Sequence, residues 1–194
     1  MSFITDMIMQ QVGDGAAGKI AEQLGVSESV AKTAISAGLP MLMGALGRNA
    51  SDPSGAEALS GALQKDHDGS ILNDLMGALG DSGQLDAGSA ILKHVLGNKQ
   101  GNAQQAIGQA AGMDAGQAGD LLSMLAPIVL GQLGKTQQEQ GLDASGLADI
   151  LQGERKNADE QLGGMMGLLD MDGDGEVTDD VMSIGKRLLS RFFS

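Results

Sequence analysis

The chain has 194 residues, of which 12 are Lys or Arg and 25 are Asp or Glu, so that its formal net charge is −13. It contains 31 Gly, about 16% of the residues against a usual ~7%, only three Phe, and no Cys, Trp or Tyr. The absence of Cys excludes disulfides, thiolate metal sites and cysteine nucleophiles. The net acidity argues against nucleic acid as a partner, because its phosphates repel a negatively charged surface.

The beginning of the chain does not have the pattern of a signal peptide, since Met1–Gln11 has no basic residue and carries Asp6 within an apolar stretch. The longest uncharged runs of mainly apolar residues are Thr33–Gly47 and Leu121–Gly134, with 15 and 14 residues. Both are shorter than the ~20 residues that span a bilayer, and each contains a proline. We therefore expect two buried helices, no transmembrane segment and a cytoplasmic location.

A pattern typical of a helix-turn-helix follows the N-terminal stretch. Ile20–Ser27, followed by Val30, fits a first helix that ends at a glycine and a second helix that begins after a capping serine. DNA recognition requires basic or amide side chains on the second helix, whereas residues 27–39 offer only Lys32, close to Glu28. The sequence thus predicts the turn geometry but disfavours nucleic-acid binding through it.

An internal repeat relates the two halves of the chain. A shift of 87 positions aligns Gly25–Gly47 with Gly112–Gly134, with seven identities in 23 positions. The shared pattern is S-x-x-x-P-x-x-x-G-x-L-G. Such self-similarity is typical of repeated supersecondary units. We predict two helical repeats, residues 1–99 and residues 100–194, which could also pack into one compact domain overall.

The proline of each repeat, Pro40 or Pro127, follows apolar residues at helical spacing. A proline inside a helix removes one hydrogen bond and frees the carbonyl four residues earlier, here that of Ser36 or Ser123. Each repeat is therefore predicted to form either a kinked helix or two short helices that meet at the proline. The glycines that follow are expected to let another backbone approach closely and then to end the helix.

Further helical patterns fill the rest of the chain, and no alternating strand pattern occurs, so the predicted fold class is all-α with eight to eleven helices. These segments are Ser54–Gln64, Ser70–Gly80, Ala87–Leu96, Asn102–Ala111, Asp143–Gln152 and Asn157–Leu169. Several Asp and Ser residues lie near the expected helix starts, where a side-chain oxygen can cap the helix by accepting hydrogen bonds from free amides. These residues are Asp52, Asp68, Ser70, Asp114 and Asp143.

The two histidines do not indicate an active site. His67 lies between Asp66 and Asp68, and His94 is far from it in sequence. Two histidines at this separation are too few for a metal-dependent hydrolase. We expect His67 to be exposed, with Asp68 or Ser70 capping a helix that begins at Ile71. No nucleophile elbow, P-loop or dinucleotide-binding motif is present. The sequence predicts a protein that is not an enzyme and has no small-molecule substrate.

The segment Asp170–Asp180 contains six carboxylates in eleven residues. An EF-hand loop places oxygen ligands at positions 1, 3 and 5, a glycine at 6 and a backbone carbonyl at 7. Helical patterns flank the segment on both sides, and a hard cation such as Ca²⁺ prefers several converging carboxylates. This predicts an EF-hand-like calcium loop. The residues that meet the register are Asp170, Asp172, Asp174, Gly175 and Glu176.

The loop departs from the EF-hand pattern at position 12, where Val181 stands in place of a bidentate glutamate. Asp179 and Asp180, at positions 10 and 11, could supply the missing oxygens. The alternative is a solvated Asp-rich turn that caps a helix and binds no ion. In the first half, Asp81–Asp86 could be a degenerate counterpart of this loop, to which we assign no metal.

The end of the chain, Val181–Ser194, has the pattern of an amphipathic helix. We expect it to dock on the body of the protein or on a partner chain rather than on a membrane surface. Its apolar and basic residues are Val181, Ile184, Leu188, Leu189 and Phe192, and Lys186, Arg187 and Arg191.

Three of these motifs together resemble the YidB-like bacterial family of unknown function, over roughly Gly13 to Leu189. They are the Pro127 motif that follows Gly112-Met-Asp, the string Asp66-His-Asp-Gly-Ser70, and L-D-x-D-G-D-G-x-x-x-D-D-V from Leu169 to Val181. The resemblance implies an all-helical domain with homeodomain-like helix arrangements. It implies no catalytic residue.

We therefore expect a non-enzymatic, cytoplasmic helical protein that acts as a structural or self-associating module, with one Ca²⁺-stabilised loop. Glycine- and methionine-rich faces suit close and adaptable helix contacts, which favours a homo-oligomer or another protein as the partner. The alternative is a regulator derived from a helix-turn-helix, which would bind a protein or nucleic acid.

Overall fold

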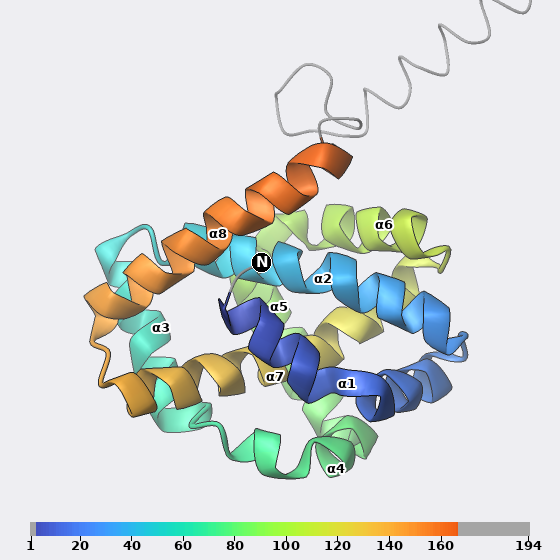
Figure 1. Ribbon diagram of the computed structural model, residues 1–194, viewed down its shortest axis with the longest axis horizontal. Coiled ribbons are helices and arrows are strands. Elements are labelled where there is room, and N and C mark those ends of the chain that lie inside the picture. Colours follow the sequence, from blue (N-terminus) through green and yellow to red (C-terminus); the bar gives the residue numbers. More distant parts are fainter. Residues whose placement is uncertain (1–2, 167–194) are drawn as a thin grey trace, which may run out of the picture.

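Helices account for most of residues 3–166, the part of the chain that the computed structural model describes (Figure 1). No strand occurs within this range, so the all-α prediction is confirmed. The elements are α1 (Phe3–Leu24), α2 (Glu28–Asn49), α3 (Pro53–Asp66), the 3₁₀ helix η1 (Ser70–Asp74), α4 (Leu75–Gly80), α5 (Ser82–Val95), the 3₁₀ helix η2 (Gly97–Lys99), α6 (Gln100–Ala111), α7 (Ala115–Gln140) and α8 (Ala144–Met166).

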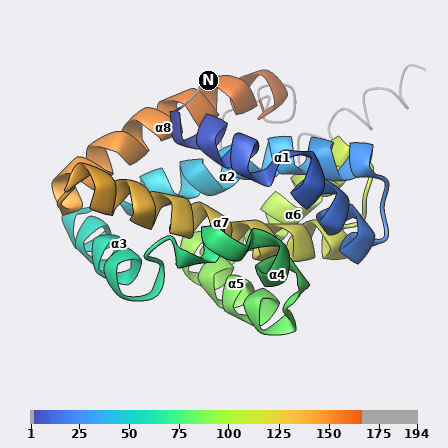
Figure 2. The same ribbon diagram turned by 60° about the horizontal axis from the view of Figure 1, so that its bottom comes forward.

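The two repeat helices, α2 and α7, form the centre of the fold. Every residue from Ala37 to Gly47 in α2 and from Leu121 to Gly134 in α7 is buried. Helix α2 packs against α1, α6, α7 and α8, and α7 packs against α1, α3, α5 and α6. In Figure 2, α8 and α1 lie on one side of the molecule, and α4 and α5 on the other. The prediction that both uncharged runs form buried helices is confirmed.

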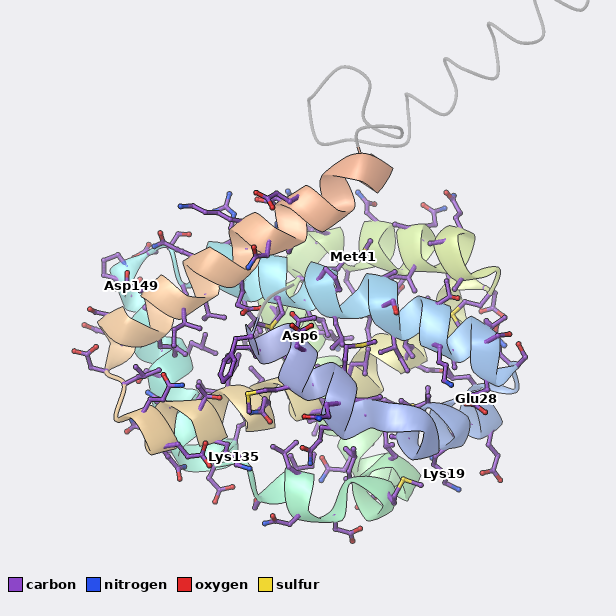
Figure 3. All side chains as sticks on the ribbon, viewed as in Figure 1. Asp6, Lys19, Glu28, Met41, Lys135 and Asp149 are labelled. Carbon is purple, nitrogen blue, oxygen red and sulfur yellow. The ribbon has the colours of Figure 1, made fainter. Side chains whose placement is uncertain are left out.

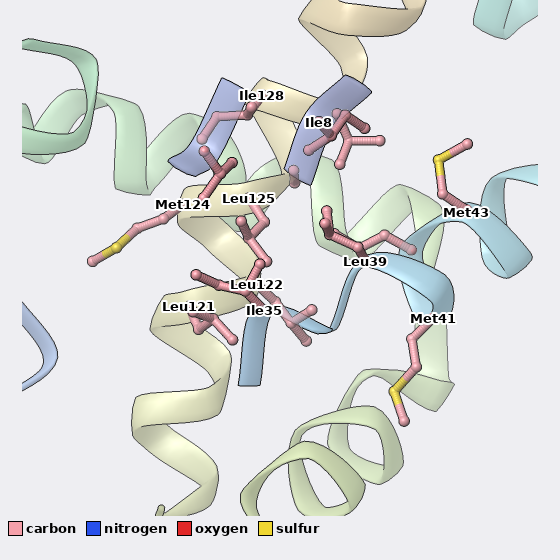
Figure 4. Packing of buried hydrophobic residues seen from close by; sticks show 14 of the residues in the cluster. Ile8, Ile35, Leu39, Met41, Met43, Leu121, Leu122, Met124, Leu125 and Ile128 are labelled. Carbon is pink, nitrogen blue, oxygen red and sulfur yellow. The ribbon is translucent and has the colours of Figure 1, made fainter. Parts of the chain in front are cut away.

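The core between these helices is aliphatic. Ile8 of α1, Leu39 of α2 and Leu125 of α7 are each fully buried and lie close to one another in Figure 4. The cluster extends from Ile4 to Leu151 along the sequence and so draws residues from both sides of position 100. Burial of an aliphatic side chain of this size contributes about 1.5–3 kcal/mol, so this shared cluster is the main source of stability.

Of the two alternatives predicted at each proline, a kinked helix or two short helices, the second is wrong. Pro40 lies inside the continuous helix α2, and Pro127 lies inside the continuous helix α7. The glycines do not end the helices either, because α7 continues for six residues beyond Gly134. Close packing on all sides holds both helices together across the missing hydrogen bond.

The glycines do permit close approach, as predicted. A Cβ on Gly47 of α2 would lie 2.7 Å from the carbonyl oxygen of Leu151 in α8. A Cβ on Gly134, the equivalent residue of α7, would overlap the carbonyl oxygen of His67 at the end of α3. The same position of the repeat thus receives the backbone of the helix that follows the repeat helix of the other half, since α8 follows α7 and α3 follows α2.

The turn that precedes each repeat helix has the same geometry in both halves. Gly25 and Gly112, 87 positions apart, have φ of 66° and 73° and end α1 and α6. A side-chain oxygen then accepts from the third residue of the next helix, at 3.3 Å from Ser27 Oγ to Val30 N in the first half. The second half has a full capping box on Asp114. The turn geometry predicted after Ile20 is therefore present, and α6 and α7 are joined by a similar glycine turn.

Three boundaries differ from the predictions. The segment predicted at 143–152 and the described part of the one predicted at 157–169 belong to one helix, α8, and the helix predicted at 70–80 divides into η1 and α4. Residues 82–86 form the first turn of α5, capped by a 2.8 Å hydrogen bond from Gly83 N to Asp81 Oδ1. The hypothesis of a degenerate loop at Asp81–Asp86 is wrong, because Asp81 begins a helix there.

Four of the five predicted capping residues accept hydrogen bonds from backbone amides near helix starts: Asp52, Asp68, Asp114 and Asp143. The prediction is wrong for Ser70. It is the first residue of η1, and its own amide donates to Asp68 Oδ1 at 2.9 Å. Hydrogen bonds from Ser70 lower the pKa of the Asp68 carboxyl.

Candidate functional site

The predicted calcium ligands lie outside the described residues. The EF-hand-like loop and its carboxylate ligands therefore remain a prediction from the sequence. Among residues 3–166, no group of three or more His, Cys, Asp or Glu side chains is placed to hold a metal ion. The six predicted calcium ligands are Asp170, Asp172, Asp174, Glu176, Asp179 and Asp180.

The exposed face at the start of α2 is not cationic. Lys32, the only basic residue there, forms an ion pair with Glu28 at 2.8 Å, and both side chains are about half exposed. Figure 3 shows Glu28 at the outer surface of the helix. At the corresponding junction of the second half, the exposed charged residue of α7 is Asp120. Neither junction presents the positive surface that phosphate contacts require.

The prediction that His67 is exposed is wrong, because the residue is half-buried at the end of α3. Burial lowers the pKa of its imidazole, since desolvation disfavours the charged ring, and the nearby Asp66 carboxylate opposes this shift only in part. His94 is exposed on α5, where its Nδ1 lies 3.0 Å from the Ala90 carbonyl oxygen. The histidines therefore occupy separate local environments.

The most distinct surface feature is an apolar hollow between the η1–α4 segment, α5 and α7, with an empty volume of about 250 Å³. Pro127 and Ile128 of α7 form its base, and Gln84 of α5 is its one polar side chain. Part of this volume is open solvent, and a water-sized sphere finds only about 10 Å³ of room inside. Binding sites for small molecules usually measure roughly 300–1,000 Å³, so this hollow is a shallow apolar depression and not a ligand pocket. The residues that line it are Ile71, Ala78, Leu79, Gln84, Leu85, Met124, Pro127 and Ile128.

The surroundings of the hollow are acidic. Five Asp and no Lys or Arg lie between Lys65 and Lys93. Three of these, Asp74, Asp81 and Asp86, are exposed on the segment that lines the hollow.

The basic residues that pack near this segment are themselves paired with carboxylates. Lys19 of α1, close to α4 in Figure 3, lies 3.2 Å from Glu22, and Lys135 of α7 lies 4.0 Å from Glu139. The hollow is thus an apolar surface with a negative rim.

A second hollow lies further along α5, with an empty volume of about 160 Å³. Its lining is entirely apolar and comes from α2, α5 and α7. Met76 of α4, 49% exposed, adds apolar surface next to the first hollow. The residues that line the second hollow are Leu42, Leu46, Ile91, Val95, Ala126, Val129 and Leu130.

A carboxylate of α8 holds the start of α1. Glu154 is only 6% exposed, and its Oε1 accepts from Ile4 N at 3.3 Å. Its Oε2 accepts from Thr5 Oγ1 at 3.1 Å. A negative charge beside the first amides of a helix is favoured by the helix dipole. Glu154 therefore has a structural role that its sequence neighbourhood did not indicate.

Comparison with protein families places these helices in a known group. The family described as "Bacterial protein of unknown function (DUF937)" matches residues 6–137. The chain belongs to this family. The matched range runs from α1 into α7 and so includes both helix–turn–helix junctions and the apolar hollow. It ends before α8 and the Asp170–Asp180 segment.

No curated protein matched the DUF937 chain, and no solved structure did. Membership of this family shows no activity, because its members are described only as bacterial proteins of unknown function. The YidB-like name and the homeodomain-like arrangement stay predictions from the sequence.

Within the described residues, α2 is long and apolar enough, by length and composition, to cross a membrane. It has 22 residues and a mean hydropathy of 1.3 over its most apolar stretch. However, 78% of that stretch is buried by the surrounding helices. This burial is also typical of the central helix of a folded domain.

Proposed function

We propose that this DUF937 protein is a non-enzymatic helical module that self-associates through its apolar hollow. The observation that carries this proposal is the combination of seven apolar lining side chains with a single polar one, Gln84, in a volume smaller than common ligand pockets. Apolar surface removed from water contributes about 25 cal/mol per Å², so a protein segment that filled the hollow would be stabilised by burial.

The proposal includes a tandem duplication as the origin of the central helix pair. The equivalent turns at Gly25 and Gly112, and the equivalent close contacts at Gly47 and Gly134, support it. In each half, a helix, a turn and a proline-containing buried helix follow one another. Two such units that pack together would share one core.

The proposal also retains the EF-hand-like loop as a Ca²⁺ site, from the spacing of its carboxylates alone. The segment carries six of the 25 acidic residues, so a bound cation would relieve strong local repulsion. The cytoplasmic location expected from the sequence is kept as part of this proposal.

The test of self-association is the mass of the full chain in solution, measured by light scattering over a range of concentrations. We expect a dimer or larger species, which Leu85→Glu should convert to a monomer, because a charge cannot enter the apolar hollow without a partner. Ala87→Glu, two residues away on the exposed face of α5, is the matched control and should leave the mass unchanged. A wild-type chain that remains monomeric at the highest concentration would contradict the proposal.

The second candidate is a regulator derived from the helix-turn-helix, which the duplicated junction favours. The Lys32–Glu28 ion pair leaves little positive charge for phosphates, so we rank this candidate below self-association. A gel shift with duplex DNA at moderate salt distinguishes the two, because clear binding would support the regulator.

A further inference from the structure

We infer that the N-terminal arm, Phe3–Val12, swings out at Gly13 and docks in the same place on a second copy of the chain. The exchange of an identical element between two copies is domain swapping, a low-cost route to dimers. This exchange does not involve the apolar hollow, so it goes beyond the proposed function. Three features of the molecule support it: a hinge, the anchoring of the chain after the hinge, and the contacts that the arm makes with the body.

The hinge is a break within α1. Gly13 has φ of 30° and ψ of −172°, which are not helical angles, and a helical stretch lies on either side of it. Figures 1 and 2 show α1 as two segments that meet at an angle. A positive φ combined with ψ near 180° is open essentially only to glycine. Helical angles at this residue would make α1 one straight helix, and a short hinge under strain favours domain swapping.

The part of α1 after the hinge is fastened to the body at its end. Gln117 Nε2 of α7 donates to Leu24 O at 2.9 Å. Gln23 Nε2 donates to Leu79 O of α4. The chain then enters the buried helix α2 through a glycine turn. This half of α1 therefore stays in place, and a hinge that straightens moves only the arm.

The arm binds the body through one apolar face. Ile4, Ile8 and Val12 recur at spacings of four, and their side chains are 0%, 0% and 3% exposed. Ile8 lies close to Leu39 of α2 and Leu125 of α7 in Figure 4. An arm that swings out exposes these side chains and the core beneath them to water, which is unfavourable. Two chains whose arms have both swung out can bury these surfaces again by exchanging arms.

Polar contacts favour the same arm over an unrelated helix at this position. On the body they come from α7, α8 and η1, and the side chains of Glu154 and Gln132 are only 6% and 1% exposed. An unrelated helix would have to replace these contacts, because buried polar groups without partners are costly. The arm of a second copy restores all of them. The contacts join Glu154 Oε1 and Oε2 to Ile4 N and Thr5 Oγ1, Gln11 Nε2 to Leu72 O, and Gln132 Nε2 to Met7 Sδ.

Gly13→Ala tests the hinge. Alanine disfavours a φ of 30° and favours helical angles, so the substitution destabilises the bent form of α1 and stabilises the straight one. We expect about a tenfold effect per hinge, equivalent to about 1.4 kcal/mol, and thus about a hundredfold lower dissociation constant for a dimer with two hinges. Light scattering of the full chain over a range of concentrations measures this constant. Gly18→Ala, where a Cβ meets no atom within 4 Å, is the matched control and should leave it unchanged.

Cross-linking distinguishes exchanged arms from any other dimer. Gln11→Cys with Asn73→Cys places two thiols beside the hydrogen bond from Gln11 to Leu72 O, and the natural chain has no Cys to interfere. A short bismaleimide joins these thiols within one chain when the arm is closed and between two chains when the arms are exchanged. In denaturing electrophoresis, we expect mainly a dimer-sized product with Gly13→Ala and mainly a monomer-sized product with Gly18→Ala.

The same cysteine pair without a glycine substitution gives a measurement that does not require Gly13→Ala to fold. Exchange needs two chains, so refolding from urea at increasing protein concentration should raise the dimer-sized fraction. A dimer-sized product that is absent at every concentration would overturn the inference. A Gly13→Ala chain that folds as a monomer would also overturn it.

The outcomes separate this inference from the proposed function. A dimer that cross-links only within single chains would overturn arm exchange and leave association through the hollow intact. If Leu85→Glu leaves the mass of the wild-type dimer unchanged, association through the hollow is wrong. A cross-link between chains in Gly13→Ala would still support arm exchange in that case.

Discussion

Gly88 of α5 lies directly against the backbone carbonyl of Ser123 in α7, so closely that a Cβ on Gly88 would overlap the carbonyl oxygen. Pro127, four residues after Ser123, has no N–H and therefore leaves this carbonyl without its helical donor. Pro127 frees the carbonyl of α7 and Gly88 leaves room for it on α5, so the two residues together allow the helices to pack closely. It brings α5 and α7 together beneath the apolar hollow that both helices line.

Gly88→Ala should destabilise the protein, because the added methyl group meets backbone and neither helix can move without disturbing the core. We expect a loss of about 1–3 kcal/mol in the free energy of unfolding, measured by helical circular dichroism in urea. The control is Gly153→Ala, at an exposed position of α8 where a Cβ meets no atom within 4 Å. This control should gain up to about 1 kcal/mol from helix propensity. Equal effects of the two substitutions would contradict the packing argument.

Two glycines of the first repeat should respond differently to the same substitution. Gly47→Ala places a methyl group 2.7 Å from the Leu151 carbonyl oxygen and should lower the unfolding free energy by about 1–3 kcal/mol. Gly44→Ala finds its nearest neighbours at 3.8 Å, an ordinary contact, and should be neutral or slightly stabilising. Urea unfolding of both variants tests the pair, and a Gly44→Ala loss as large as that of Gly47→Ala would count against the close approach of α8.

Local signals in the sequence predicted most of the helices. The apolar periodicity, the repeated proline motif and the capping aspartates such as Asp114 act within one or two turns, and the structure confirms them. Tertiary packing decided the rest. The continuity of α7 through Pro127 and its extension beyond Gly134 depend on neighbouring helices that no local pattern reveals.

The candidate site was not predicted, because its residues come from four elements. Ile71, Leu85 and Met124 are ordinary apolar residues in their own segments, and only the packing of α5 on α7 brings them together. One signal was available in the sequence, the lack of Lys or Arg between Lys65 and Lys93. The burial of Glu154 was likewise invisible, since its partners at the start of α1 lie 149 and 150 positions away.

Glu154→Gln should loosen the beginning of α1 while leaving the rest of the fold in place. The substitution keeps the shape of the side chain but removes the charge that accepts from Ile4 N and Thr5 Oγ1. Hydrogen bonds to charged groups contribute about 1.5–3 kcal/mol, so amide exchange in residues 3–12 should rise by about tenfold or more. Glu160→Gln, at an exposed position of the same helix, is the control. Unchanged exchange at Ile4 would show that Glu154 does not hold this helix.

His67 should make the protein less stable at mildly acidic pH. The pKa of the buried imidazole is lowered from 6.5, so the unfolded chain binds the proton more readily than the folded one. The stabilising effect is complete above pH 6.5 and is lost as the pH falls from 6.5 through the lower pKa of the folded state. Melting temperatures at pH 7.5 and pH 5.5 should differ less in His67→Gln than in the wild type. His94→Gln is the control, and an equal change in both variants would contradict the role of burial.

Calcium should raise the melting temperature of the full chain if Asp170–Asp180 binds the ion. Ligand at about 100 times its Kd stabilises a folded state by about 2.7 kcal/mol, which corresponds to several degrees for a chain of this size. The chain has no Trp or Tyr, so helical circular dichroism with calcium or with chelator is the measurement. Asp172→Asn with Asp174→Asn should abolish the shift, whereas Asp81→Asn, which removes an acid outside the loop, should retain it. Isothermal titration counts the bound ions directly. The absence of heat and of any shift would leave the solvated Asp-rich turn as the correct interpretation.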